Sequence, residues 1–209
     1  MVAAFWGRFP NRVAVQWNLS GPAKWADKFP GLLFCPVLSV ALALLLGWIP
    51  RLDPRLRREP EANERSNAAI GAIRLATTAL VSFGALLIAA EALGHRVNSV
   101  RLGINLVLLF FVVLGNYIGT VRPNYSVGIR TPWTLESDDV WRATHRNCGR
   151  ILVFGTLAFF ALQLLVGQAY MLPCYFGFVA ATGLWSVIYS YLRLRSANPP
   201  APPHGGHSG

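Results

Sequence analysis

Charged residues are scarce in this sequence, and acidic ones are the scarcest. Asp, Glu, Lys and Arg make up 13% of the 209 residues, whereas hydrophobic residues make up 54%. Soluble domains carry roughly 25% charged residues, and the mean hydropathy here is +0.42. The shortage of charge argues against a soluble globular protein and predicts an integral membrane protein.

Cysteine is also rare, and its spacing gives no metal or redox motif. Cys35, Cys148 and Cys174 form no CxxC pair, and three thiols cannot all pair within one chain. Isolated cysteines in or near apolar segments usually behave as small hydrophobic residues. We therefore expect no disulfide framework, no metal site and no cofactor.

The net charge of +10 comes mainly from Lys and Arg in loops between apolar runs. Such a charge could indicate binding to nucleic acid. Basic loops beside membrane spans are, however, the usual pattern in membrane proteins. We therefore expect membrane lipids as partners and no direct contact with nucleic acid.

Long apolar runs predict five membrane-spanning helices. The runs occupy residues 31–49, 68–93, 102–121 and 151–192. The last run is too long for one crossing of a hydrocarbon core about 30 Å thick, and Gly167 and Pro173 mark a break within it. The prediction is an all-α polytopic transmembrane helix bundle over residues 31–195. An N-terminal segment precedes it over residues 1–30, and a disordered Pro- and Gly-rich tail follows over residues 196–209.

The distribution of Lys and Arg predicts the orientation of the bundle. Twelve of them lie in residues 50–67, 120–150 and 193–195, which five spans place on one side, and six lie on the other side. The positive-inside rule assigns the side with twelve to the cytoplasm. The C-terminus is then cytoplasmic and the N-terminal segment is external.

The N-terminal segment combines tryptophans with cations in the string VAVQWNLSGPAKWADK. One interpretation is a surface loop that its indoles anchor at the membrane interface. The other is an external recognition site. Its candidate residues are Trp17, Asn18, Gly21, Trp25 and Lys28.

The most informative segment is a polar loop, GNYIGTVRPNYSVGIRTPWTLESDDVWRATHR, which covers residues 115–146. Structureless loops of this length are uncommon in compact proteins and are usually functional. Pro and Gly favour fixed turns within it. The candidate functional residues are Gly115, Asn116, Tyr117, Arg122, Pro123, Asn124, Gly128, Arg130, Thr131, Pro132, Trp133, Thr134, Trp141, Arg142, Thr144, His145 and Arg146.

A helix is predicted to begin after Ser137, which can cap it, and to continue into the fourth span. Trp141, Thr144, His145 and Cys148 then share one face. Arg142, Arg146 and Arg150 form a second stripe, suited to lipid phosphates or an acidic partner, or simply a solvated basic face. Gly115 and Gly119, four residues apart, suit close helix packing.

Catalysis is not expected from this loop. His145, with Asp138 or Asp139 and Arg130, could form an acid–base site, but no nucleophile or metal-ligand spacing accompanies it. A histidine that anchors the loop through hydrogen bonds is the better interpretation. The alternative function is a small-solute transporter or channel-like protein. Arg74 and Glu91 are poor candidates for its central site because they lie near opposite ends of one span.

The loop closely resembles the signature loop of the bacterial SdpI family of membrane proteins. The matching stretches are residues 115–117, 122–124, 128–135, 140–142 and 144–146. VAVQWNLSGPAKWADK resembles the family's external N-terminal motif, which usually has His in place of Gln16. PRLDPR, which contains Asp53 between two prolines, resembles the family's next loop and reads as a shaped connector or a solvated loop.

This resemblance implies a function as well as a fold. The family generally has six spans with both ends in the cytoplasm, so this sequence lacks a counterpart of the first span. The family's namesake confers immunity to a secreted peptide toxin and sequesters a transcriptional repressor. By resemblance, the external segment would meet a toxin and the cytoplasmic loops would meet a repressor, in a bacterial cell membrane and without enzymatic activity.

Overall fold

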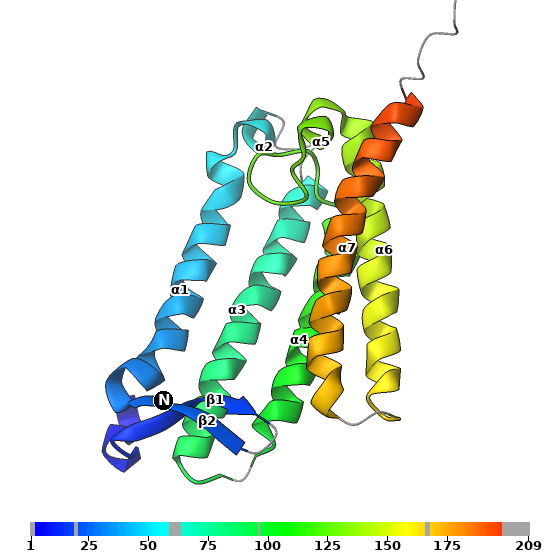
Figure 1. Ribbon diagram of the computed structural model, residues 1–209. Coiled ribbons are helices and arrows are strands. Elements are labelled where there is room, and N and C mark those ends of the chain that lie inside the picture. Colours follow the sequence, from blue (N-terminus) through cyan, green and yellow to red (C-terminus); the bar gives the residue numbers. More distant parts are fainter. Residues whose placement is uncertain (1–2, 19–20, 59–63, 96, 166–167, 198–209) are drawn as a thin grey trace, which may run out of the picture.

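Among the described residues, five long helices run side by side and give the molecule its elongated shape (Figure 1). The computed structural model describes residues 3–18, 21–58, 64–95, 97–165 and 168–197. The long helices are α1 (Lys28–Leu52), α3 (Glu64–Ala92), α4 (Ser99–Ile118), α6 (Asp138–Leu162) and α7 (Gln168–Ala197). The all-α bundle predicted from the apolar runs is confirmed.

Short elements close the two ends of the bundle (Figure 1). Helices α2 (Pro54–Arg58) and α5 (Pro132–Glu136) lie at the end where α7 finishes. A 3-10 helix, η1 (Ala3–Arg8), and an antiparallel hairpin of β1 (Arg12–Asn18) and β2 (Gly21–Asp27) lie at the other end. The hairpin was not predicted. Its sequence signal is strand-favouring residues at alternate positions, Val13, Val15 and Trp17, followed by Gly21, which adopts a positive φ of 118°.

Four of the described helices are long and apolar enough to cross a membrane: α1, α3, α4 and the Pro173–Ala197 part of α7. The other predicted span is the second half of α6. Its first half carries the polar and charged residues of the signature loop, so one continuous helix joins the two predicted elements. The break predicted at Gly167–Pro173 is only partly right. The gap between α6 and α7 lies near Gly167, but Pro173 lies inside α7 and does not end a helix. Gly167 itself and the predicted tail beyond Ala197 lie outside the described residues.

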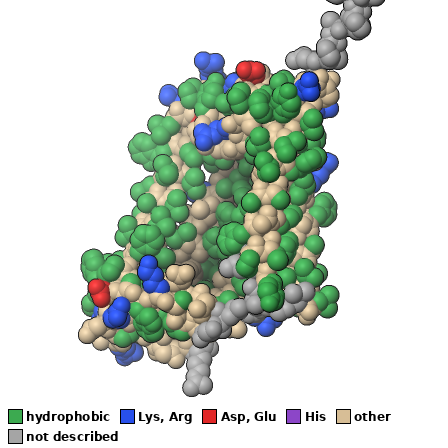
Figure 2. Space-filling model, in the orientation of Figure 1, with side chains coloured by type: hydrophobic (Ala, Val, Ile, Leu, Met, Phe, Trp, Pro, Cys, Tyr) green, Lys and Arg blue, Asp and Glu red, His purple; other side chains and the backbone are tan. Residues whose placement is uncertain are grey.

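On the face shown in Figure 2, apolar side chains are spread along the helices, while Lys and Arg gather mostly towards the two ends of the bundle. Leu75 and Phe154 are each 70% exposed and Phe34 is 67% exposed. In water such a surface would be unfavourable, whereas in a bilayer acyl chains cover it. This distribution agrees with a membrane protein that exposes an apolar belt between two polar ends.

Each end of the bundle has its own buried cluster. At the hairpin end, Phe9 and Val13 pack against Leu32 of α1 and Ile88 of α3. A Cβ added to Gly31 would lie 2.3 Å from Val13 Cγ2, so glycine is needed where the hairpin meets α1. At the other end, residues of α2, α3, α4 and the loop after α4 pack around Trp141: Leu56, Ala69, Ile70, Ile73, Ile118 and Val121.

Candidate functional site

The signature loop folds into a compact structure, here called the polar cap, formed by residues 119–137 together with Asp53 and the first half of α6. Asn124 organises its first turn and is fully buried. Its Oδ1 accepts from the backbone N–H of Ser126 at 2.8 Å and of Val127 at 2.6 Å. Its Nδ2 donates to the carbonyls of Arg122 at 2.9 Å and Val127 at 3.0 Å. The amide thereby uses its full hydrogen-bonding capacity on the loop's own backbone.

Asp53 fastens the polar cap to the loop before α2. This carboxylate is 2% exposed. One oxygen accepts from the backbone N–H of Arg55 at 2.9 Å, and the other accepts from the N–H of Tyr125 at 2.7 Å and the hydroxyl of Ser126 at 2.8 Å. The guanidinium of Arg55 lies over the Tyr125 ring at 4.7 Å and donates to the carbonyl of Leu135 at 2.9 Å. Of the two interpretations of this loop, a shaped connector fits the structure better than a solvated loop. The sequence did not predict that Asp53 binds Tyr125 and Ser126.

His145 anchors the polar cap to α6. Its ring is stacked on Trp141, with centroids 4.1 Å apart and planes inclined by 20°. With the proton on Nδ1, the imidazole donates to the carbonyl of Trp141 at 2.9 Å, and Nε2 accepts from the backbone N–H of Ile129 at 2.9 Å. The indole of Trp141 donates to the carbonyl of Val121 at 2.8 Å. This geometry agrees with the anchoring interpretation, because both ring nitrogens already have partners.

Burial determines the protonation state of His145. Desolvation lowers its pKa to about 4, partly opposed by the hydrogen bond to the carbonyl of Trp141. The imidazole is therefore neutral near pH 7, which Nε2 requires in order to accept from Ile129.

Gly128 is required by the contact between the loop and this stacked pair. Its φ of 127° lies in a region that L side chains rarely adopt. A Cβ at this position would lie 2.4 Å from His145 Nε2 and 3.0 Å from Trp141 Cη2. The loop can approach the two rings only with glycine here.

Thr131 and Thr134 cap α5, and Trp133 fastens it to α7. The hydroxyl of Thr131 accepts from the backbone N–H of Thr134. In return, the hydroxyl of Thr134 accepts from the backbone N–H of Thr131. Pro132 occupies the first helical position. The Trp133 indole donates to the hydroxyl of Ser190, and its ring meets that of Tyr191 edge-on at 5.4 Å.

The remaining candidates of the signature loop fall into two groups. In the first group, Gly115 and Thr144 are buried, whereas Arg122 and Pro123 are half-buried. The backbone N–H of Arg122 donates to Ser66 Oγ at 3.0 Å. The other candidates, Asn116, Tyr117, Arg130, Arg142 and Arg146, are exposed. Arg130 donates to the carbonyl of Tyr125 at 2.6 Å, and Arg142 pairs with Asp139 at 3.5 Å. All three arginines of the predicted stripe, Arg142, Arg146 and Arg150, are therefore exposed. Arg142 and Arg146 take no part in the hydrogen bonds that hold the polar cap.

At the opposite end of the bundle, a cavity of about 850 Å³, here called the N-terminal cavity, lies between the hairpin and the α3–α4 connection. Of the predicted external recognition residues, Trp17, Asn18, Gly21 and Trp25 line it. Lys28 does not line it and instead lies with its ammonium 4.8 Å from the centre of the Trp6 ring.

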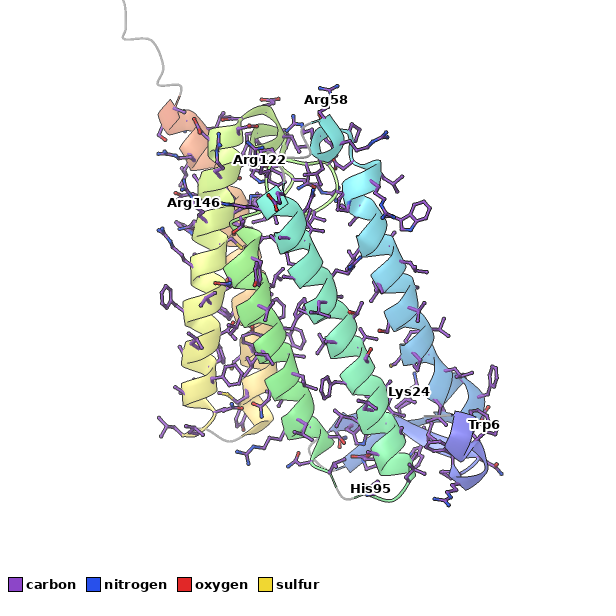
Figure 3. All side chains as sticks on the ribbon, turned by 180° about the vertical axis from the view of Figure 1, so that it is seen from behind. Trp6, Lys24, Arg58, His95, Arg122 and Arg146 are labelled. Carbon is purple, nitrogen blue, oxygen red and sulfur yellow. The ribbon has the colours of Figure 1, made fainter. Side chains whose placement is uncertain are left out.

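Glu91 joins the two walls of the N-terminal cavity. One carboxylate oxygen accepts from the indole N–H of Trp17, and the other accepts from the hydroxyl of Ser99. The sequence placed Glu91 near a membrane interface but did not connect it with Trp17, which is 74 residues away. His95 also lines the cavity and lies beyond the end of α3 (Figure 3).

Comparisons with known proteins match two separate parts of this chain. Residues 120–190 match the model of the SdpI/YfhL protein family, and residues 1–40 match that of a domain of unknown function, DUF1648. The chain is 25% identical to the immunity protein SdpI of Bacillus subtilis (strain 168) over 162 residues, which are 76% of this chain and 72% of that protein. No solved structure gives a significant match. The resemblance to the SdpI family is confirmed.

Proposed function

We propose that this chain, a membrane protein similar to the SdpI family, protects a bacterial cell against a secreted peptide toxin that it binds in the N-terminal cavity. The observation that supports this most is the clustering of four predicted recognition residues around one cavity of about 850 Å³. A cavity of that size, lined by two indoles and a few polar groups, suits a peptide segment with apolar side chains. The name of the Bacillus subtilis relative supports the same class of function.

The cavity is suited to ligand binding because its walls are fixed at both sides. Trp17 is half-buried and hydrogen-bonded to Glu91, whereas Trp25 is 50% exposed. A peptide that covers Trp25 buries apolar area without first having to order the hairpin, which limits the entropy cost of binding. We therefore assign Trp25 the larger share of ligand contact and Trp17 a positioning role.

A finer proposal concerns signalling across the membrane. Helix α4 begins beside the N-terminal cavity at Ser99 and ends at Ile118, which packs near Trp141 in the polar cap. A ligand that competes for Glu91 changes the contact of this carboxylate with Ser99. In this proposal α4 then shifts against α6, and the polar cap, on the cytoplasmic side, presents its exposed arginines to a transcriptional repressor.

Protection can be tested in a toxin-sensitive bacterium that expresses this chain and is exposed to a secreted peptide toxin from the same source. Trp25→Ala is expected to reduce protection at least 10-fold in toxin concentration. Arg8→Ala is the matched control, because Arg8 is exposed on the same segment but does not line the cavity. Full protection by a normally inserted Trp25→Ala protein would contradict the proposed binding site.

Recruitment of a repressor needs its own test. Changing Arg142, Arg146 and Arg150 together to Gln should abolish co-purification of a cytoplasmic repressor while leaving toxin binding intact. Unchanged recruitment of the repressor by this variant would contradict the signalling proposal but not the immunity proposal.

The transporter alternative predicts substrate flux into vesicles that Arg74→Gln or Glu91→Gln abolishes. In the structure Glu91 belongs to the N-terminal cavity, whereas Arg74 lies beside Gly47 of α1, where a Cβ would meet its guanidinium at 2.5 Å. The two groups thus line no common central path, and we prefer the immunity proposal.

A further inference from the structure

A groove of about 340 Å³ lies on the outside of the bundle, between the last turns of α4 and the middle of α6. Three glycines line it: Gly115 of α4, Gly119 directly after the end of α4, and Gly149 of α6. Arg146 and Arg150 also line it, and Phe154 forms its apolar end. This feature, here called the glycine groove, is separate from both the N-terminal cavity and the hydrogen bonds of the polar cap.

The glycine groove lies where the backbones of α4 and α6 are in direct contact. A Cβ on Gly149 would lie 2.5 Å from the carbonyl oxygen of Gly115, and one on Gly115 would lie 2.9 Å from the carbonyl oxygen of Gly149. These glycines are therefore already used for packing within the chain. They leave no close-packing stripe for a second copy, which argues against the groove as a helix–helix dimer site.

The charge of the glycine groove is positive and uncompensated. Arg146 and Arg150 are exposed and lie one helical turn apart, and no acidic side chain lines the groove. Within the described residues neither arginine has an ion pair, in contrast to Arg142, which pairs with Asp139. Two guanidinium groups without a counter-ion favour an oxyanion, and a phosphate above all, because their planar N–H groups match its oxygens.

The position of the glycine groove indicates which phosphate is available. The charge-free run of the sequence begins at residue 151, directly after Arg150. One turn further into that run, Phe154 is 70% exposed. The groove therefore crosses the boundary between a polar and an apolar surface. Figure 3 shows Arg146 at the same end of the bundle as Arg122, away from the hairpin.

We propose that the glycine groove binds an anionic phospholipid. Arg146 and Arg150 hold its phosphate, and one acyl chain lies over Val153 and Phe154. Basic pockets between transmembrane helices are suited to anionic headgroups, because the arginines meet the phosphate at the depth where the acyl chains begin. A bound lipid would join α4 to α6 next to their tightest contact. This proposal does not depend on toxin immunity.

Native mass spectrometry of the full chain, purified in detergent, tests the proposal directly. The probes are phosphatidylglycerol and phosphatidylcholine with the same acyl chains. The wild-type chain should retain phosphatidylglycerol in preference to phosphatidylcholine. Replacing both Arg146 and Arg150 by Gln should weaken phosphatidylglycerol binding roughly 30-fold, since each cation near a lipid phosphate is worth about 1 kcal/mol, or about fivefold.

Two further variants separate charge from folding. Arg142→Gln removes a neighbouring exposed arginine that does not line the groove, so it should bind phosphatidylglycerol as the wild type does. The double change of Arg146 and Arg150 to Lys keeps both charges and should retain most of the binding. Equal retention of the two lipids, or undiminished binding by the folded double Gln variant, would overturn the proposal. Displacement of the lipid by millimolar glycerol phosphate would also overturn it, because it would point to a site for a soluble phosphate.

Discussion

The carboxylate of Asp53 accepts a hydrogen bond from the backbone N–H of Tyr125 at 2.7 Å, across 72 residues of sequence. It joins two loops that follow different transmembrane helices. Because the carboxylate is 2% exposed, its charge is stabilised by N–H and O–H donors and not by water.

Asp53→Ala should destabilise the polar cap by about 3 kcal/mol. The change leaves the donors of Tyr125, Ser126 and Arg55 without their acceptor, and hydrogen bonds to a charged group are worth about 1.5–3 kcal/mol each. Thermal unfolding of the detergent-solubilised protein measures the effect. Asp139→Ala is the matched control, because its exposed pair with Arg142 should contribute less than about 1 kcal/mol. Equal effects of the two changes would show that Asp53 does not hold the cap.

Gly128→Ala should lower stability more than the same change at Gly94. Both glycines have positive φ, 127° and 87°, so both alanines are strained by about 1 kcal/mol or more. Only the alanine at 128 would also meet His145 Nε2 at 2.4 Å, whereas the Cβ at 94 meets nothing within 4 Å. Comparison of the two unfolding midpoints isolates the steric part. Similar midpoints would contradict the contact between the loop and the stacked rings.

The polar cap should weaken as the pH falls from about 6.5 to about 4. The pKa of His145 is lowered to about 4 in the folded protein, from an ordinary value near 6.5 in the unfolded chain. Above pH 6.5 both states are neutral and the contribution of His145 to stability is fully present. Below that pH the unfolded chain binds the proton first, so stability falls until the pH passes below 4, by a total on the order of 3 kcal/mol.

Unfolding midpoints measured between pH 4 and 8 test this dependence. His145→Gln should lower stability at pH 8 and flatten the part of the pH dependence that lies between 4 and 6.5. His95→Gln, which changes an exposed imidazole on the N-terminal cavity, should leave that part unchanged. A wild-type slope that survives in His145→Gln would show that another group is responsible.

Apolar periodicity and charge were sufficient to predict the bundle, because span length and loop charge are local properties of the sequence. The N-cap of α6 could also be predicted, because Ser137 precedes two acidic residues. In the structure its hydroxyl accepts from the backbone N–H of Val140. Local patterns explain in the same way the shared face of Trp141, Thr144 and His145, all of which are buried.

The contacts between distant segments could not be predicted. Asp53 with Tyr125, and Trp17 with Glu91, are pairs whose partners come from different elements, and nothing in either local sequence specifies the other. The hairpin was missed for a different reason. Its strands are short, and Ala14 interrupts the alternation of apolar and polar residues in β1, so the tryptophans and lysines of this segment indicated an interfacial loop instead.

The contacts of Trp133 with Ser190 and Tyr191 have a consequence for biosynthesis. Ser190 lies in α7, the last helix of the structure, so the ribosome synthesises it long after the loop that it holds. The polar cap can therefore close only after α7 has been inserted beside α6. Until then the indole N–H of Trp133 lacks its acceptor, and the polar cap of the newly made protein is incomplete. We therefore expect the Trp133 ring to become protected only once α7 has been synthesised and inserted.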